Sequence, residues 1–419
     1  MDAMLVTGKK VLNGQVKASG AKNSALPLIF STLLAEGEHV FHNTPRLKDI
    51  ESTCQLLQLL GCETEHKQNT LRVNIKKLKS FEAQYDVVRK MRASILCLGP
   101  LVAKYGSAQV SLPGGCAIGT RPIDLHLEGL KALGAEVVTE NGYVLAKAKR
   151  LKGGSILFEN ATVGGTENLM MAASLADGTT RIENAAKEPE IVDLANYINK
   201  MGGRIEGAGT SILTIHGVEK LKPAEHNIIP DRIEAGTLLI AGAITGGEVT
   251  VTDCEPKDLG ALIDKMRESG FKIQTEGNSM TVYKCNSWKG VDVSTTPHPG
   301  FATDLQAQFM ALMTQAEGTS VITETVFENR FMHVQELVRL GANITPKNRV
   351  AIVRGTRNQL KGAPVMATDL RASASLVLAA LAAEGDTQVN RIYHLDRGYE
   401  NLETKLSNLG AKIKRITGS

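Results

Sequence analysis

A pattern of about 70 residues recurs six times along the chain and constrains its fold more than any other feature. Each copy holds one glycine after a long apolar run and a second glycine after an amphipathic run. The first set is Gly37, Gly106, Gly178, Gly247, Gly318 and Gly385, and the second is Gly61, Gly134, Gly202, Gly270, Gly341 and Gly410. Because two independent sets keep nearly the same spacing, the sequence predicts six copies of one supersecondary unit.

All six copies are predicted to contain the same order of elements. An Ala- and Leu-rich helix ends at the first glycine, and an alternating strand such as Glu248–Thr252 follows. An amphipathic helix such as Lys257–Ser269 then ends at the second glycine. Two further alternating segments complete the copy, and Asn141-Gly142 between two of them is typical of a two-residue hairpin turn.

The first helix of each copy is apolar on nearly every side, a pattern typical of a helix buried at the centre of a domain. The alternating strands beside it bury only one face. We therefore expect an α/β fold with helices inside and sheets outside. If the starts of the buried helices converge, their amide ends create a positive field there.

The sequence predicts two lobes. The sixth copy is short, but Met4–Asn13 resembles Leu213–Lys222 of the third copy. Residues 1–20 are therefore predicted to complete the sixth copy. The copies then divide into a first lobe, 21–229, and a second lobe, 230–419 plus 1–20, joined by two chain crossings that would form a hinge.

Composition excludes several classes of function. The formal net charge is +4, from 48 basic and 44 acidic side chains, which is too weak to indicate nucleic acid or an anionic membrane as the main partner. The longest apolar runs, Ala25–Ala35 and Leu376–Ala383, are too short to span a membrane. The six cysteines form no C-x-x-C pair and no zinc-ligand spacing. We expect a reduced, cytoplasmic protein without a metal.

A cysteine loop in the first lobe (111–121) is the most distinctive local feature. The stretch Ser111–His126 reads SLPGGCAIGTRPIDLH, and its Pro-Gly-Gly run breaks both helix and strand. A lone cysteine is most often a small buried apolar residue. Here the flanking glycines and the polar TRPID run argue against burial of Cys116, and a cation, Arg121, follows five residues later. The pattern favours a chemical role for the thiol.

Charged residues stand at the predicted starts of the apolar helices: Lys22, Arg92, Asp231, Asp304 and Arg371. Aspartate suits such a position as a cap and dipole partner. A cation at a helix N-terminus is unfavourable, so the lysine and the two arginines indicate that an anion binds nearby.

Two arginines and three histidines remain open to a plainer interpretation. Arg330 in FENRFMH and Arg397 in HLDRGYE are candidate ligands or ordinary surface ion pairs. His126, His333 and His394 lack ligand-like spacing and are interpreted as structural.

Several stretches together resemble the family of UDP-N-acetylglucosamine 1-carboxyvinyltransferases, a branch of the EPSP synthase family. They run almost end to end: SGAKNSALP, RKMRAS, SLPGGCAIGTRPIDLH, NAAKEPEIVD, FATDLQAQF, TETVFENRFMH, ATDLRAS and DRGYENLE. The resemblance implies a two-lobed inside-out α/β barrel of six βαβαββ repeats. It also implies transfer of the enolpyruvyl group of phosphoenolpyruvate to the sugar hydroxyl, the first committed step of peptidoglycan synthesis.

The same resemblance implies roles for individual residues. Cys116 would be the general acid and the site of attack by fosfomycin, and Asp304 the base near the sugar hydroxyl. Residues implied to contact phosphoenolpyruvate are Lys22, Asn23, Arg121, Arg330, Arg371 and Arg397, of which Lys22 and Arg397 are also implied to be catalytic. Residues implied to contact the uridine sugar are Arg92, Arg121, Pro122, Ile123, Asp124, Leu125, Asp304 and Val326. No organic cofactor or metal is implied, and both partners are small molecules.

One position departs from the family pattern. Many members have a lysine in a K-V-S-V-G run where this chain has Asn160-Ala-Thr-Val-Gly, which would weaken contact with the diphosphate or shift it to another residue. Three other functions were considered: a shikimate phosphate acceptor, a silent UDP-sugar sensor, and a ring around nucleic acid. The cysteine loop argues against the first two and the weak net charge against the third.

Overall fold

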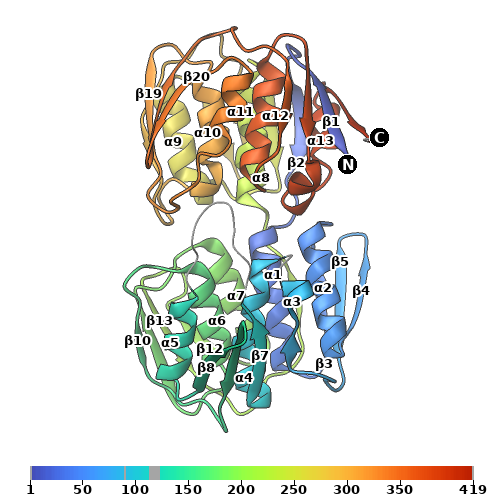
Figure 1. The fold of residues 1–419 in the computed structure, drawn as a ribbon, viewed down its shortest axis with the longest axis vertical. Coiled ribbons are helices and arrows are strands. Elements are labelled where there is room, and N and C mark those ends of the chain that lie inside the picture. Colours follow the sequence, from blue (N-terminus) through green and yellow to red (C-terminus); the bar gives the residue numbers. More distant parts are fainter. Residues whose placement is uncertain (1, 89–90, 113–122, 418–419) are drawn as a thin grey trace. The chain divides into compact units, whose positions relative to one another are not determined.

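The computed structural model describes residues 2–88, 91–112 and 123–417, and the chain divides into two compact units (Figure 1). Of the described residues, those from Gly20 to Ile229 form the first unit, and those up to Ser19 and from Pro230 onward form the second. Each unit has its own apolar core.

The described residues of the first unit form three four-stranded sheets and three largely buried apolar helices. The sheets, in spatial order, are β14 (Glu225–Asn227), β3 (Gly37–His42), β5 (Thr70–Ile75) and β4 (Glu63–Lys67); β6 (Glu82–Ala83), β7 (Ser107–Ser111), β9 (Tyr143–Lys147) and β8 (Glu136–Glu140); and β10 (Ser155–Leu157), β11 (Thr179–Glu183), β13 (Ile212–His216) and β12 (Arg204–Glu206). The apolar helices are α1 (Lys22–Ser31), α4 (Leu98–Tyr105) and α6 (Val163–Ala173). The other helices are α2 (Lys48–Leu60), α3 (Tyr85–Val88), α5 (Asp124–Ala132) and α7 (Pro189–Lys200), with 3-10 turns η1 (Thr32–Leu34) and η2 (Arg92–Cys97).

The described residues of the second unit form the same kinds of elements, namely four-stranded sheets, apolar helices and amphipathic helices. Its sheets are β22 (Pro364–Met366), β23 (Asp386–Asn390), β1 (Ala3–Thr7) and β24 (Lys412–Ile416); β16 (Ile273–Glu276), β17 (Ser279–Val282), β15 (Glu248–Thr252) and β2 (Asn13–Lys17); and β18 (Val293–Ser294), β19 (Thr319–Thr323), β21 (Val350–Arg354) and β20 (Asn343–Lys347). Its apolar helices are α8 (Arg232–Ile244), α10 (Gln306–Met313) and α12 (Ala372–Ala382). Amphipathic helices α9 (Gly260–Ser269), α11 (Val334–Arg339) and α13 (Leu402–Asn408) accompany 3-10 turns η3 (Pro256–Leu259), η4 (Thr303–Leu305) and η5 (Ile392–Arg397).

All six sheets share one topology: an edge strand runs parallel to its neighbour, and the remaining pairs are antiparallel. β1 lies between β23 and β24, as expected for a strand that completes the sixth copy. The prediction that all of residues 1–20 complete that copy is wrong for β2, which pairs with β15 of the fourth copy. The reason lies in the strand pairing at the two chain crossings: β14, which precedes α8 in the chain, pairs with β3 of the first unit, and β2, which precedes α1, takes the parallel edge beside β15.

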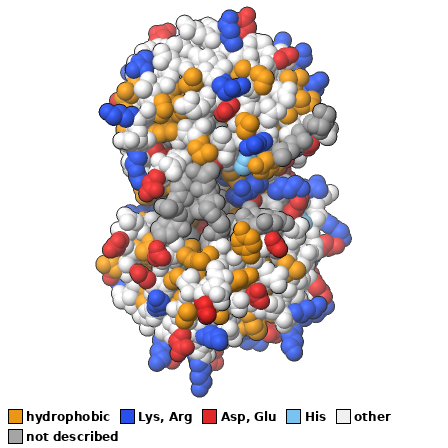
Figure 2. Space-filling view, in the orientation of Figure 1, with side chains coloured by type: hydrophobic (Ala, Val, Ile, Leu, Met, Phe, Trp, Pro, Cys, Tyr) orange, Lys and Arg blue, Asp and Glu red, His pale blue; other side chains and the backbone are white. Residues whose placement is uncertain are grey.

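The apolar helices are largely buried, as their composition predicted, although the last turn of α4 is half-buried. Every residue of α12 is buried, and in α8 only the first residue, Arg232, is not. Sheet residues alternate between buried and accessible, as in β15. On the face shown in Figure 2, lysine and arginine side chains are interspersed with aspartate and glutamate, in keeping with the weak net charge. Among the described residues, no helix has the length and apolar character needed to cross a bilayer.

Glycines in the left-handed conformation follow the amphipathic helices, at the predicted helix ends. All six glycines of the second set have positive φ, between 86° and 115°. In the first set five of six do, but at Gly247 the preceding Gly246 takes the positive φ of 68° instead. The prediction that the apolar helices end at this set is correct for α4, which Gly106 caps, and wrong for the other five, which end two or more residues earlier. The Asn141-Gly142 turn has φ values of 51° and 79° and joins β8 to β9, which confirms the hairpin.

The two ends of α9 provide a test of the backbone argument. Gly270 follows the helix with φ of 115°, whereas Gly260 begins it with φ of −49°, and a Cβ would meet nothing within 4 Å at either position. We expect Gly270→Ala to lower the free energy of unfolding by about 1 kcal/mol or more, because an alanine would be strained at this positive φ, whereas an alanine at position 260 would not. The control, Gly260→Ala, should leave stability unchanged or raise it. Urea unfolding of both variants measures the difference, and equal effects would contradict the argument.

Candidate active site

In the second unit, one carboxylate lies between two buried guanidinium groups. Asp304 belongs to η4, immediately before α10. Its Oδ1 accepts a hydrogen bond of 2.6 Å from Nη2 of Arg330, and its Oδ2 lies 3.8 Å from Nε of Arg371. The two arginines are only 4% and 2% exposed, although they come from segments about 40 residues apart. Three residues predicted for the site are therefore brought together.

Arg371 connects the starts of two apolar helices. It is the N-cap residue of α12, and its Nη2 donates to Oδ2 of Asp231 at 3.0 Å. Asp231 caps α8, because its Oδ1 accepts from the amides of Ile233 and Glu234. Nη1 of Arg371 donates to the carbonyl of Gly398 at 2.9 Å. All three nitrogens of this guanidinium therefore face acceptors of the protein itself.

The charges in this cluster are balanced within the protein. Burial by itself lowers the pKa of Arg371. The carboxylates of Asp231 and Asp304 raise the pKa by more than burial lowers it, so the net pKa lies above its ordinary value. The pKa of Arg330 behaves in the same way, with Asp304 as the strongest opposing influence. A cation at the start of α12 is thus tolerated because protein carboxylates accompany it. That explanation adds to the bound anion expected from the sequence.

Glu324 organises the edge of the cluster, and the sequence analysis did not single it out. This buried carboxylate accepts from the hydroxyl of Thr303 at 2.8 Å and from the amide of Val326 at 2.8 Å. Arg330 also donates to the Thr303 hydroxyl at 2.9 Å. Glu324 therefore connects Thr303, the residue before Asp304, to Val326. Its position within the TETVFENR stretch was the only signal in the sequence.

Two more predicted residues of the second unit, Val326 and Arg397, lie beside the carboxylate–arginine cluster. Val326 is 38% exposed, so its side chain remains accessible beside this cluster. Arg397 ends η5 and is half-buried. The carbonyl next to it, that of Gly398, accepts from Arg371. The chain therefore places Arg397 one residue away from the cluster.

In the first unit, Lys22 opens α1 with a carboxylate beside it. Its ammonium group lies 2.8 Å from Oδ2 of Asp49, and the two residues are 9% and 2% exposed. Asp49 is in the first turn of α2 and was missed by the sequence analysis. Asn23 follows Lys22 and is half-buried. A buried lysine at a helix start is again accompanied by a carboxylate of the protein.

The start of α5 holds the described part of the predicted sugar-contacting run. Ile123 is the N-cap residue, Asp124 is exposed, and Leu125 is half-buried. Arg92 begins η2, as predicted for a helix start. Cys116, Arg121 and Pro122 lie outside the described residues. Predicted residues of the first and second units belong to different compact bodies.

Asn160, the position at which the sequence departs from the expected family pattern, is exposed two residues before the cap of α6. The side chain of the cap residue, Thr162, accepts from the amide of Gly165 at 3.2 Å. The Thr162 hydroxyl therefore caps the N-terminus of α6. The side chain at position 160 remains accessible to solvent.

The histidines agree with their structural interpretation. Burial lowers the pKa of His126 to about 4, and its Nδ1 is bonded to the Asn168 amide at 2.9 Å. Burial lowers the pKa of His333 to about 4 as well. A neutral, buried imidazole is a packing element rather than a titrating group near neutral pH.

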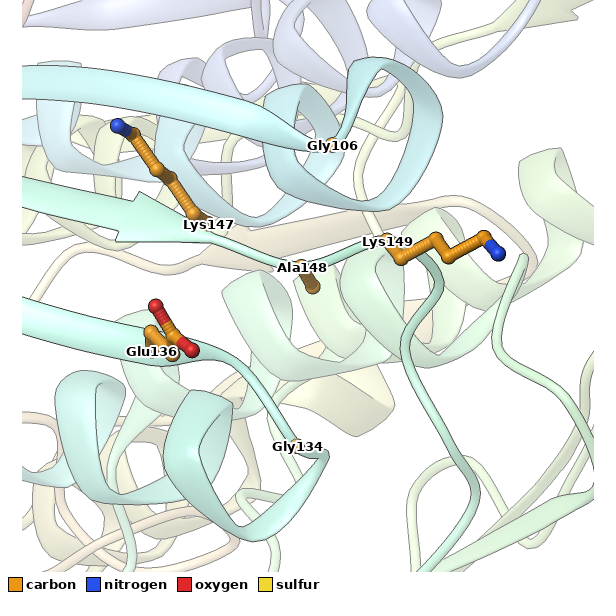
Figure 3. A pocket seen from close by; sticks show the side chains of 6 residues that line it. All are labelled: Gly106, Gly134, Glu136, Lys147, Ala148 and Lys149. Carbon is orange, nitrogen blue, oxygen red and sulfur yellow. The ribbon is translucent and has the colours of Figure 1, made fainter.

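Two surface hollows lie elsewhere. The larger, of about 390 Å³, is lined by Gly106, Gly134, Glu136, Lys147, Ala148 and Lys149 (Figure 3). Gly106 caps the C-terminus of α4, so this hollow lies at the opposite end of that helix from its start. In Figure 3 the Lys147 and Lys149 side chains point away from each other. Without converging charges this hollow is no candidate for catalysis.

Comparisons with known proteins identify the family. A sequence model described as EPSP synthase (3-phosphoshikimate 1-carboxyvinyltransferase) matches residues 6–406, so the chain belongs to this family. It is 69% identical over 413 residues to a UDP-N-acetylglucosamine 1-carboxyvinyltransferase of Bdellovibrio bacteriovorus, covering 99% of this chain and 100% of the relative. A protein of the same name from Myxococcus xanthus is 57% identical over 418 residues, with 99% of each chain covered.

Solved structures show the same α/β fold. The enolpyruvyl transferase NikO from Streptomyces tendae superposes with a TM-score of 0.89 at 26% identity, covering 100% of this chain and 99% of that one. An EPSP synthase from Acinetobacter baumannii superposes with a TM-score of 0.78 at 17% identity, covering 99% and 100%. The second likeness concerns the fold alone.

The Arg371 contacts predict a large effect on stability. We expect Arg371→Met to lower the free energy of unfolding by about 3–5 kcal/mol, because Asp231 would be left as a buried charge without its cation. The control is Arg72→Met, whose partner Glu38 is 3.0 Å away at the surface, with a cost below about 1 kcal/mol. Chemical unfolding of both variants compares them, and similar losses would contradict the buried-pair argument.

Proposed function

We propose that this protein transfers the enolpyruvyl group of phosphoenolpyruvate to the 3′-hydroxyl of UDP-N-acetylglucosamine, releasing phosphate. This reaction is the first committed step of peptidoglycan synthesis. The observation that carries the proposal is the 69% identity, along essentially the full length, to a relative named for this activity. The cysteine loop and the ordered carboxylate–arginine cluster support it, because the reaction needs an acid, a base and fixed cations.

The proposed mechanism is addition followed by elimination. Cys116 would donate a proton to the methylene carbon of the donor, since a thiol is mostly protonated below its ordinary pKa of about 8.5. The sugar hydroxyl would attack the oxocarbenium-like centre while Asp304 accepts its proton. The tetrahedral ketal would then lose phosphate and a proton from the methyl group, which restores the carbon–carbon double bond in the product.

Asp304 is suited to remain anionic in this role. The two guanidinium groups beside its carboxylate favour the ionised form. Its backbone carbonyl also accepts a hydrogen bond of 2.9 Å from Gln308, which holds the turn in place. This pairing makes the carboxylate a weaker base, so the hydroxyl proton would pass to it only as the attacking hydroxyl becomes acidic, while its fixed charge would stabilise the developing cation.

The arginines would divide the work of holding the donor. The pair Arg330 and Arg371 is balanced by Asp304 and Asp231, so these four groups carry no net charge between them. We propose that Arg330 and Arg371 orient the donor carboxylate, with Arg371 also fixing the helix starts. Lys22, Arg121 and Arg397 would stabilise the charge on the leaving phosphate.

We further propose that the architecture is a two-lobed inside-out α/β barrel with three βαβαββ copies in each lobe. The six sheets of one topology and the six buried apolar helices support this description. The lobes would be 21–229, and 230–419 with 1–20. The chemistry needs only proton transfers and fixed charges, so we propose no cofactor or metal. Its substrates are small cytoplasmic molecules, which favours a cytoplasmic location.

Phosphate release measures the proposed reaction directly. With phosphoenolpyruvate and UDP-N-acetylglucosamine together we expect continuous release, and with phosphoenolpyruvate alone none. Substituting 3-phosphoshikimate for the sugar tests the other acceptor of the family. Cys116→Ser should lose most turnover, at least about a hundredfold, because a hydroxyl is a far weaker acid. Titration should show that the sugar nucleotide still binds, and an unchanged rate would remove the acid assignment.

The donor-phosphate assignment makes a separate prediction. We expect Arg397→Ala to raise the KM for phosphoenolpyruvate by tenfold or more, since a charge-assisted hydrogen bond contributes about 1.5–3 kcal/mol. The KM for the sugar nucleotide should change much less. Arg391→Ala is the control, because Arg391 is an exposed arginine at the other end of η5. Equal changes in both KM values for Arg397→Ala would count against the assignment.

A further inference from the structure

A buried aspartate joins three distant parts of the first unit. Asp193 lies in α7 and is 3% exposed. Its Oδ2 accepts from the hydroxyl of Ser24 at 2.5 Å and lies 3.4 Å from the amide of Ile229. Its Oδ1 accepts from Nε2 of His226 at 2.8 Å. One carboxylate thus links α1, β14 and the segment that leads out of the first unit.

These contacts fix the first turn of α1, where the predicted donor-binding residues lie. Ser24 immediately follows Lys22 and Asn23. The amide of Ala21, before them, donates to the carbonyl of Ile229 at 2.7 Å. Ile229 itself approaches Asp193 through its amide. The turn Ala21–Ser24 is therefore held on both sides of Lys22 and Asn23 by a closed ring of hydrogen bonds through Asp193.

The chemistry of the carboxylate explains why aspartate occupies this position. Three donors converge on its two oxygens: a hydroxyl, a ring N–H and an amide. Nζ of Lys200 lies 3.2 Å from Nδ1 of His226, which leaves Nε2 to carry the proton toward Asp193. An asparagine would present an NH2 group to at least one of these donors. Buried polar groups left without a partner are costly, so the network favours one arrangement of the turn.

We propose that Asp193 is a positioning residue that acts through Ser24 to hold Lys22 and Asn23 in place for the phosphate-bearing donor. The inference rests on the proposed function. It assigns no contact between Asp193 and substrate. Lys22 has Asp49 beside it, so a small displacement of the α1 turn would move the ammonium group relative to that partner. An ammonium group displaced in this way would hold the charged donor less well.

α1 contains a matched control. Ser24 and Ser31 are both fully buried serines on this helix. Ser24 donates to Asp193, whereas Ser31 donates to the backbone carbonyl of Leu28 near the other end. Replacing either serine by alanine removes one buried hydroxyl from the same helix. Only the first replacement breaks the link to Asp193.

The test is steady-state phosphate release by Ser24→Ala, Ser24→Thr, Ser31→Ala and Asp193→Asn, with thermal midpoints measured in parallel. We expect Ser24→Ala to raise the KM for phosphoenolpyruvate about tenfold, with less than about a twofold change for UDP-N-acetylglucosamine. Ser24→Thr retains a hydroxyl and should stay near wild type. Ser31→Ala should change neither KM.

Each remaining outcome is decisive. Equal KM changes for Ser24→Ala and Ser31→Ala, or a Ser24→Ala variant that loses only thermal stability, would overturn the positioning role. If Asp193→Asn fails to fold, the serine variants still decide the question. If the wild-type protein releases no phosphate with these substrates, the proposed function fails and this inference fails with it. If the wild-type protein is active but Ser24→Ala changes both KM values equally, the inference fails and the proposed function stands.

Discussion

Burial of apolar helices is the constraint on which the rest of this structure depends. In α8, α10 and α12 nearly every side chain is excluded from water, and α1 and α6 are similar. Such helices cannot present a polar face to solvent, so their charged and polar groups are concentrated at their ends. The first turns carry unsatisfied amides and a positive partial charge. Polar chemistry in each unit is therefore gathered at helix starts by the same requirement that forms the core.

Carboxylates at these starts determine which cations can be placed there. Asp49 accompanies Lys22, while Asp231 and Asp304 accompany Arg371. The Lys22–Asp49 and Arg371–Asp231 pairs are buried, so removal of one partner leaves the other charge in a medium of low polarity with its nearest counterion missing. The cations are consequently held in fixed positions before any substrate arrives. Preorganisation of this kind favours stabilisation of charge that develops during a reaction.

Buried carboxylates also join the helix starts to the rest of each unit. Asp193 connects α1 to β14, and Glu234 in α8 accepts from the amide of Ser19 and from Lys405. Burial raises the pKa of Glu234 above its ordinary value, and the nearby Lys405 opposes that change. Ser19 and Ile229 are the last residues of their units before the chain passes to the other. Ordered hydrogen bonds at these two points fix where each unit ends.

The sequence by itself determined the periodic features. Glycine positions predicted where the amphipathic helices end, Asn141-Gly142 predicted a hairpin, and apolar composition predicted buried helices, because each depends on local backbone or burial preferences. Only the tertiary structure decided that β2 serves the fourth copy, and that Asp49, Glu324 and Asp193 organise the helix starts. These partners lie far from their targets in sequence, and no local pattern encodes which carboxylate the folded chain brings to which cation.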